Sequence, residues 1–133
     1  MPANQILDNE FATLWFHTEK KIVHHKIKKW IKGDDLKNLF NKGYEVLKQN
    51  NAQKWLSDDR NNSVLSPEDE KWAREDWFVR VLQAGWKYWA VVLPEKVVGQ
   101  MNIKRFSDDY SKAGITARLF SDPDEALKWL ESV

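Results

Sequence analysis

A polar stretch in the middle of the chain holds most of the side chains that could do chemistry. It reads WLSDDRNNSVLSPEDEKW, from Trp55 to Trp72, and its pattern predicts a buried strand, a polar loop and a strongly capped helix. In an open α/β sheet, ligands usually bind beyond the carboxyl ends of the strands. The sequence therefore predicts a ligand-binding crevice lined by this loop and by the segment after the next strand, with these candidate residues: Asp58, Asp59, Arg60, Asn61, Ser63, Pro94 and Gln100.

Two adjacent carboxylates, Asp58 and Asp59, close the predicted strand. Such a pair can serve as acid and base when the two environments differ, or can bind a hard cation, although Mg²⁺ sites usually need substrate phosphates as well. The alternative that we favour is structural: Asp58 accepts hydrogen bonds from loop amides, and Asp59 pairs with Arg60 or with water. Neither a nucleophile–base pair nor a metal-ligand spacing accompanies them, so we expect no enzyme, no metal and no cofactor.

Two serines of the loop are candidates for phosphorylation. Ser66 is followed by proline and acids, but its hydroxyl is better explained as a helix N-cap that accepts from the amide of Asp69. Ser63 has no such capping role. Ser63 is therefore the candidate phosphoacceptor, although an ordinary loop serine is the favoured interpretation.

The three histidines invite a metal-site hypothesis. If His17 pairs with Ile22 in a hairpin, His17 and His24 lie near each other on one face, and His25 points to the other. Two histidines without a third ligand make a weak metal site. We therefore interpret all three as ordinary sheet residues, with His25 facing inward and hydrogen-bonded.

One face of the predicted hairpin mixes aromatic and basic side chains. Phe11, Trp15 and Trp30 lie there beside Lys26 and Lys28. Stacking platforms for single-stranded nucleic acid have this composition, but the net charge of +1 does not suit a dedicated nucleic-acid binder. Because such an apolar group is not normally left in water, we predict that the face forms a homodimer contact or is covered by a helix of the same chain.

Composition narrows the function classes further. The chain has 133 residues and no cysteine, so disulfides and thiol chemistry are excluded. It contains no apolar run of membrane-spanning length and no glycine-rich phosphate loop of the Walker or Rossmann spacing. A cysteine-free chain without a membrane span suits the reducing cytoplasm, which is the predicted location.

The elements that must position these residues follow from periodicity and turn signals. Apolar alternation and breakers predict strands at 5–8, 11–17, 22–31, 53–58, 86–93 and 115–120, the second and third forming an antiparallel hairpin. Helical spacing and capping signals predict helices at 34–50, from 67 to about 84, within 98–112, and from 123 onward, with a capping box at Ser66-Pro67-Glu68-Asp69.

Alternating strands and helices require right-handed parallel crossovers. The predicted fold is therefore α/β, with an N-terminal hairpin, about four helices and a mixed, mostly parallel sheet. The strands at 22–31, 53–58 and 86–93 should pair in parallel. We find no linker or repeat, so residues 1–133 are expected to form a single domain.

Several spaced patterns of this chain resemble the SpoIIAA-like branch of the STAS domains. They are WLSDDRN, LSPEDEKW, YWAVVLPE and LFSDPDEALKWLES, and together they cover nearly the whole chain. The resemblance implies a small bacterial protein with a regulatory binding role and an α/β architecture like that of the lipid-carrying CRAL-TRIO domains. Regulatory members carry an Asp-Ser-Ser/Thr-Gly-type phosphoacceptor where this chain has Asp58-Asp59-Arg60-Asn61, which argues against phosphorylation-driven sigma-factor control.

The function predicted from sequence is thus a non-enzymatic regulatory module that binds a protein or a small molecule at the strand ends. The alternative is a small carrier of a lipid or another apolar ligand, in which Trp72, Trp77 and Phe78 would line a cavity. A cavity of several hundred Å³ would favour the carrier. A hydrolytic enzyme using Asp58 or Asp59 is the least favoured class.

Overall fold

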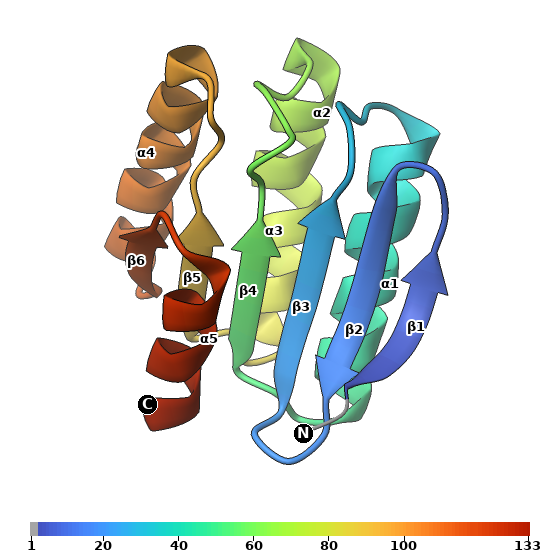
Figure 1. Ribbon diagram of the computed structural model, residues 1–133, viewed down its shortest axis with the longest axis vertical. Coiled ribbons are helices and arrows are strands. Elements are labelled where there is room, and N and C mark those ends of the chain that lie inside the picture. The colour runs from blue at the N-terminus through green and yellow to red at the C-terminus, as the bar shows by residue number, and fades with distance from the viewer. Residues whose placement is uncertain (1–2) are drawn as a thin grey trace.

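The computed structural model describes residues 3–133, so residues 1 and 2 of the predicted domain lie outside the described part. Figure 1 shows one twisted sheet with helices on both faces. The elements of the described chain are β1 (Asn4–Asp8), β2 (Ala12–His17), β3 (Ile22–Ile27), α1 (Asp34–Gln49), β4 (Lys54–Asp58), α2 (Pro67–Trp72), the π-helical segment η1 (Ala73–Trp77), α3 (Phe78–Gln83), β5 (Tyr88–Val92), α4 (Val97–Lys112), β6 (Thr116–Phe120) and α5 (Pro123–Ser132).

The six strands lie side by side in chain order, from β1 to β6. β1, β2 and β3 pair antiparallel, whereas β3, β4, β5 and β6 pair in parallel. The predicted parallel pairing of the three central strands is confirmed, and so is a mostly parallel α/β sheet with four helical segments, if α2, η1 and α3 are counted as one.

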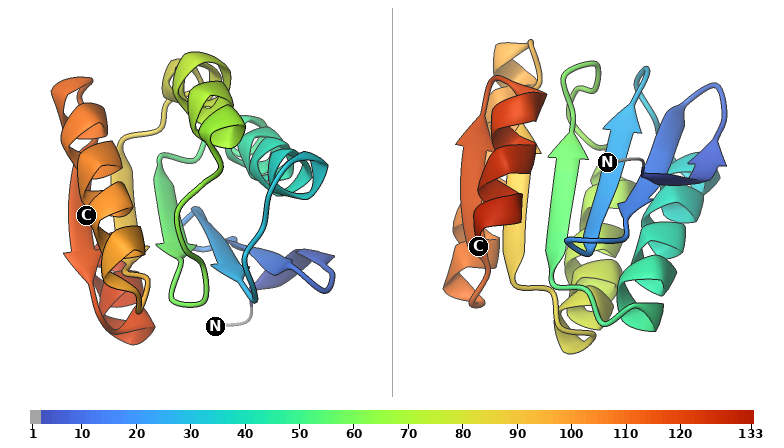
Figure 2. Two further views of the ribbon diagram at one scale, coloured as in Figure 1. Left: turned by 90° about the horizontal axis from the view of Figure 1, so that it is seen from above. Right: turned by 60° about the horizontal axis from the view of Figure 1, so that its bottom comes forward.

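This strand order decides where the helices lie. Each crossover from β3 to β6 is right-handed and moves in the same direction across the sheet, so α1, the α2–η1–α3 helix and α4 all cover one face. Figure 2 shows these three on one side of the sheet and α5 on the other. Because the order never reverses between β3 and β6, the sheet lacks the topological switch point at which open α/β sheets usually form a crevice.

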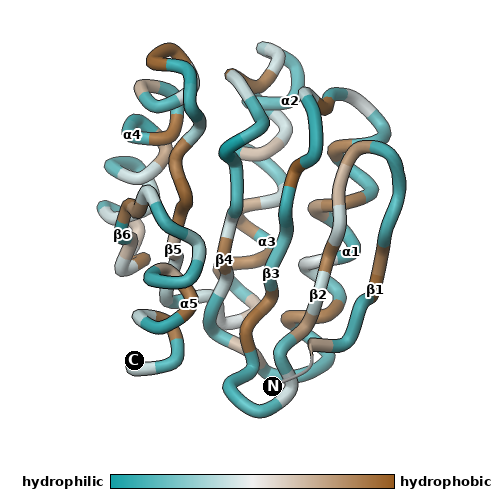
Figure 3. Tube along the Cα trace, viewed as in Figure 1, coloured by the Kyte–Doolittle hydropathy of each residue, from teal (hydrophilic) through white to brown (hydrophobic). Residues whose placement is uncertain are grey.

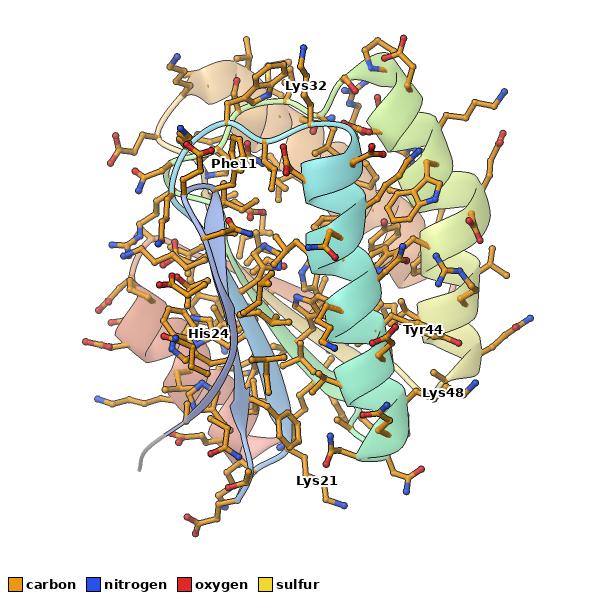
Figure 4. All side chains as sticks on the ribbon, turned by 90° about the vertical axis from the view of Figure 1, so that its right-hand side faces the viewer. Phe11, Lys21, His24, Lys32, Tyr44 and Lys48 are labelled. Atoms are coloured by element: carbon orange, nitrogen blue, oxygen red, sulfur yellow. The ribbon has the colours of Figure 1, made fainter. Side chains whose placement is uncertain are left out.

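The hairpin has the predicted register. His17 pairs with Ile22, Leu14 with His25 and Trp15 with His24. We call the face covered by α1, α3 and α4 the inner face, and the opposite one the outer face. His25 is therefore on the inner face, and Trp15 and His24 are on the outer face, as Figure 4 shows for His24 on the side away from α1.

Two residues of the predicted aromatic face are elsewhere. β3 ends at Ile27 and not at Ile31, so Trp30 lies in the following loop, 45% exposed, where its indole donates to the carbonyl oxygen of Val64. Phe11 precedes β2, in a turn held by the side chain of Asn9, and packs against the inner core. The prediction that Phe11, Trp15 and Trp30 share one face was wrong, because strand alternation does not extend into turns.

The inner core is rich in tryptophan. The ring centroid of Trp86 lies 5.6 to 5.9 Å from those of Trp55, Trp77 and Trp89, within the range of favourable aromatic pairs. Figure 3 shows the strongly apolar β5 that runs through this region. A smaller core under α5 contains Ile22, Leu56 and Leu130.

The helix from Pro67 to Gln83 has one widened turn. Ser66 caps its start, as predicted, and accepts from the amide of Asp69 at 3.2 Å. The reciprocal half of the predicted capping box is replaced: the Asp69 carboxylate accepts from the amide of Gly33, at 2.9 Å, and thereby ties this helix to the start of α1. The π-helical segment was not predicted. There, the amide of Phe78 donates to the carbonyl oxygen of Ala73.

Candidate functional site

A small cavity lies between the inner face of the sheet and its three helices. Its volume is about 50 Å³, room for a few water molecules or a group of that size. Its polar wall comprises side chains from β3, β4, the loop after β4, and α4: His25, Ser57, Asp59, Asn62 and Asn102. Its aromatic wall consists of Phe40, Trp77, Trp86, Trp89, Phe106 and Tyr110.

A chain of hydrogen bonds crosses the polar wall. The indole of Trp55 donates to Nδ1 of His25 at 3.0 Å, and Nε2 of His25 lies 2.9 Å from Oδ1 of Asp59. An indole nitrogen can only donate. Nδ1 must therefore carry the lone pair and Nε2 the proton, so His25 is neutral and donates to Asp59. His25 and Asp59 are only 3% and 6% exposed, which fixes both groups in place.

A second tryptophan fixes the serine of this wall. The indole of Trp89 donates to Oγ of Ser57 at 2.8 Å. The Ser57 hydroxyl accepts this hydrogen bond, so its own proton remains free to donate. Both indoles thus orient polar groups that line the cavity.

Asn62 is the exception among the buried polar groups. It is 8% exposed, and its Oδ1 is fully enclosed without a hydrogen-bond partner within residues 3–133. Leaving a buried acceptor unpaired costs about 1–3 kcal/mol. An acceptor of this kind on a cavity wall is suited to a donor that a ligand or a water molecule would bring.

The two adjacent carboxylates face opposite sides of the sheet. Asp58 lies on the outer face and is 2% exposed, and the guanidinium of Arg60 holds it in a bidentate pair at 2.9 and 2.8 Å. The hydrogen bonds that Arg60 donates to Asp58 raise the pKa of Arg60. The predicted pair of Asp59 with Arg60 does not form: Asp59 bonds to His25, and the side chain of Arg60 turns back to Asp58, which also accepts from the amide of Arg60.

The widened turn and a glycine shape the cavity from the helix side. Ala73 and Trp77, the two ends of η1, both line it, and π-helical turns are frequent at functional sites. In α1, Gly43 lies against the ring of Trp55: a Cβ there would be 2.7 Å from Cζ2. The absence of a side chain at Gly43 therefore sets the position of the indole that orients His25.

The loops after β4 and β5 meet beside the cavity, as expected for the ends of neighbouring parallel strands. A Cβ on Gly99 would lie 2.8 Å from the Pro94 ring and 3.5 Å from Cα of Ser63. Nε2 of Gln100 donates to the carbonyl oxygen of Pro94. Of the predicted crevice residues, Asp59 and half-buried Ser63 line the cavity, whereas Asn61 is exposed and Asp58 and Arg60 lie on the outer face.

The outer face over β2 and β3 carries a second polar cluster. Nε2 of His17 lies 3.0 Å from Nδ1 of His24, and the rings of Trp15 and His24 are 4.8 Å apart. Burial, reinforced by His17, lowers the pKa of His24 to about 3. Within the described chain, no group of three or more His, Asp or Glu is placed to hold a metal ion.

Some site residues were identified from the sequence and others were missed. Asp59 and Ser63 were candidates, and His25 was expected to face inward and be hydrogen-bonded, as it is. Asn62 belongs to the loop that was expected to line the crevice but was not singled out, and Asn102 was missed. Strand alternation from Trp55 through Ser57 would have shown that Asp59 faces His25, but the sequence contains no comparable signal for Asn102 on α4.

Comparisons with known proteins identify no relative: no family model, no curated protein and no solved structure matches the chain. Over residues 3–133, no helix has both the length and the apolar character needed to cross a membrane.

Proposed function

We propose that this protein is a non-enzymatic regulatory module that binds a small ligand in the cavity at the carboxyl ends of β3 and β4. The observation that carries the proposal is Asn62, which lines the cavity and whose enclosed Oδ1 lacks a hydrogen-bond partner within residues 3–133. The same space is lined by the carboxylate of Asp59, held in place by His25. A ligand with hydrogen-bond donors would satisfy both groups.

The position of the cavity suggests how binding becomes a signal. Asp59 directly follows the end of β4, Asn62 belongs to the loop after it, and Asn102 belongs to α4. A ligand that contacts all three would tie the loop and α4 to the sheet. A partner protein that recognises the loop or the start of α4 would then distinguish the two states, since ligands act by favouring the state they bind better.

The chemistry of the wall favours binding over catalysis. Both ring nitrogens of His25 are engaged, so this histidine has no free lone pair with which to act as a base. Asp58 and Asp59 lie on opposite faces of the sheet and cannot act on one substrate as an acid–base pair. These contacts support the proposal that the protein is not an enzyme.

The alternative of a lipid or apolar-ligand carrier has less support. The aromatic wall of the cavity fits an apolar ligand. Of the three residues expected to line a carrier's cavity, Trp77 does so, whereas Trp72 and Phe78 do not. Pockets for drug-sized ligands usually enclose about 300–1,000 Å³, and the space here is about 50 Å³. The cavity is therefore too small for an acyl chain without rearrangement of the helices.

Native mass spectrometry of protein purified from its own host tests the proposal. We expect a bound small molecule that is lost in Ala73→Leu, because the larger side chain fills the cavity. Asn61→Ala, at an exposed neighbour of Asn62, is the matched control and should keep the ligand. A ligand retained by Ala73→Leu, or no ligand in any preparation and no hit in a thermal-shift screen, would exclude the cavity as the site.

We further propose that the chain is a STAS-type domain, that it is located in the cytoplasm and that it forms a homodimer. The mostly parallel α/β sheet and the cysteine-free sequence are compatible with the first two. For the dimer, half-buried Trp15 belongs to β2, and α5 does not lie over this strand in Figure 1. If this face is a dimer contact, Trp15→Lys should shift sedimentation toward the monomer while the far-UV circular dichroism stays unchanged. A wild-type protein that sediments as a monomer would contradict the dimer.

A further inference from the structure

Asp59 is a buried carboxylate without a countercharge. Its hydrogen-bond partner within residues 3–133 is His25, and the hydrogen bond from Trp55 keeps that imidazole neutral. The nearest arginine in the chain, Arg60, is held by Asp58 on the other face. A buried charge that is not paired is costly. The cavity beside Asp59 is therefore a place where a cation would be stabilised.

The opposite wall of the cavity suits the same charge. Trp77, Trp86 and Trp89 line it, and tryptophan rings attract a cation most strongly of the aromatic side chains. Among the cation–π pairs of residues 3–133, Lys32 and Lys37 lie over Trp30 and Trp72, which are not on this wall. Arg74 lies over Phe106, but it is paired with Glu70 and Asp109.

The unpaired acceptor of Asn62 limits which kind of cation the cavity can bind. Oδ1 of Asn62 requires a donor, and a quaternary ammonium has no N–H. A metal ion would need more anionic or imidazole ligands than the cavity offers, because within the described chain no such cluster of three exists. An ammonium group with N–H donors satisfies Asp59 and Asn62 together, and a cavity of about 50 Å³ accommodates one with a short alkyl chain.

We propose that the cavity binds a small primary amine as its ammonium ion. The ammonium would donate to the Asp59 carboxylate and to Oδ1 of Asn62, and its alkyl carbons would contact the indoles of Trp77, Trp86 and Trp89. This inference rests on the proposed function, because it names the ligand class of the same cavity.

Titration with methylammonium and ethylammonium chloride, followed through the indole N–H resonances of Trp55 and Trp89, tests the proposal. These two protons lie beside the cavity and report on its occupancy without requiring activity. So few non-hydrogen atoms permit a dissociation constant in roughly the millimolar range. We expect saturable shifts with both amines, and no saturable shift with tetramethylammonium, ethanol or sodium chloride.

Variants distinguish the effect of the Asp59 charge on binding from the effect of the cavity's shape. Asp59→Asn keeps the shape and should weaken binding by about tenfold or more, since hydrogen bonds to charged groups contribute about 1.5–3 kcal/mol. Asn62→Asp retains an acceptor and should bind amines at least as well as the wild type, which keeps the test valid if Asp59→Asn does not fold. Asn61→Ala is the control and should not change the affinity.

Two outcomes would overturn the proposal in distinguishable ways. If ethanol or acetamide saturates the same resonances as well as the amines do, and Asp59→Asn binds equally, the cavity is a ligand site for neutral donors and only the ammonium inference fails. If neither an amine nor a neutral donor shifts these resonances, and Ala73→Leu does not displace any ligand that copurifies from the host, the proposed function fails as well.

Discussion

His24 and His25 are neighbours in sequence, but they belong to opposite faces of the sheet and to different kinds of environment. His25 has two fixed partners, Trp55 and Asp59, and is held in one tautomer. The hydrogen-bond partner of His24 is His17, which can itself take up a proton. The inner face thus holds its histidine in one hydrogen-bonded arrangement, whereas the outer face holds two adjacent histidines whose pKa values are both lowered by burial.

The helix cover of the two faces differs for a topological reason. Three successive crossovers place α1, α3 and α4 on the inner face, whereas the outer face is covered by α5, which packs on β4, β5 and β6. The outer surface of β1 and β2 therefore lies beside α5 and not beneath it (Figure 1), whereas β3 contributes Ile22 to the core under α5. We propose ligand binding on the face that three helices cover and association through the other face.

The largest expected difference between the faces lies in two tryptophans. Trp55→Ala should lower the free energy of unfolding by about 3–5 kcal/mol, because it leaves a cavity and removes the donor of His25. Trp15→Ala, on the half-buried outer face, should cost only about 1 kcal/mol. Urea denaturation of both variants measures the contrast. Equal losses would mean that the outer face is as fully buried as the inner one.

Gly43→Ala tests how tightly α1 packs against Trp55 on the inner face. In the interior of a helix this change normally stabilises by about 1 kcal/mol. Here the added methyl group would collide with the ring of Trp55, which is 1% exposed, so we expect a loss of about 1–3 kcal/mol. Asn38→Ala, at an exposed position of the same helix, is the control and should be neutral or slightly stabilising. A stabilising Gly43→Ala would show that the packing against Trp55 is loose.

The outer face should make stability depend on pH. The pKa of His24 is lowered to about 3 in the folded protein by burial and by His17. As the pH falls through 6.5, His24 therefore takes up a proton in the unfolded chain but stays neutral in the folded protein. This contribution to stability is complete above pH 6.5 and is lost progressively as the pH falls from 6.5 toward about 3, by at most about 1.4 kcal/mol for each pH unit.

Urea midpoints from pH 5 to 8 measure this dependence. His24→Gln should flatten it. Burial also lowers the pKa of His17, so a smaller slope of the same sign should persist in that variant and decrease further in the double variant. A wild-type midpoint that stays constant between pH 5 and 7 would contradict the environment described for the pair.

The smallest effect on stability that we expect is the loss of one helix cap on each face of the sheet. Ser66 caps the cavity-side helix and Asp122 caps α5, and removing either oxygen by substitution with alanine should cost about 1 kcal/mol. Thermal or urea denaturation measures the loss. Ser66→Ala should also leave ligand binding intact, and an unchanged stability with lost binding would make Ser66 a functional residue.

Local rules predicted much of the fold. The two-residue alternation predicted the hairpin register from His17 and Ile22, and the capping signal predicted the contact between Ser66 and Asp69. Helix and strand boundaries were predicted to within a few residues, except where β3 stops at Ile27. Each of these features depends on neighbours only a few residues apart, which is why one sequence sufficed.

Packing decided the rest. Asp59 meets His25, 34 positions away in the chain, and Gly43 meets Trp55 only because α1 packs on β2 and β3, next to β4. The widened turn at Ala73 and the space beside it also depend on how three helices fit over one sheet face. The sequence alone determined which way each strand residue points. The tertiary structure decided what each side chain meets there, because partners distant in the chain come together only through the strand order.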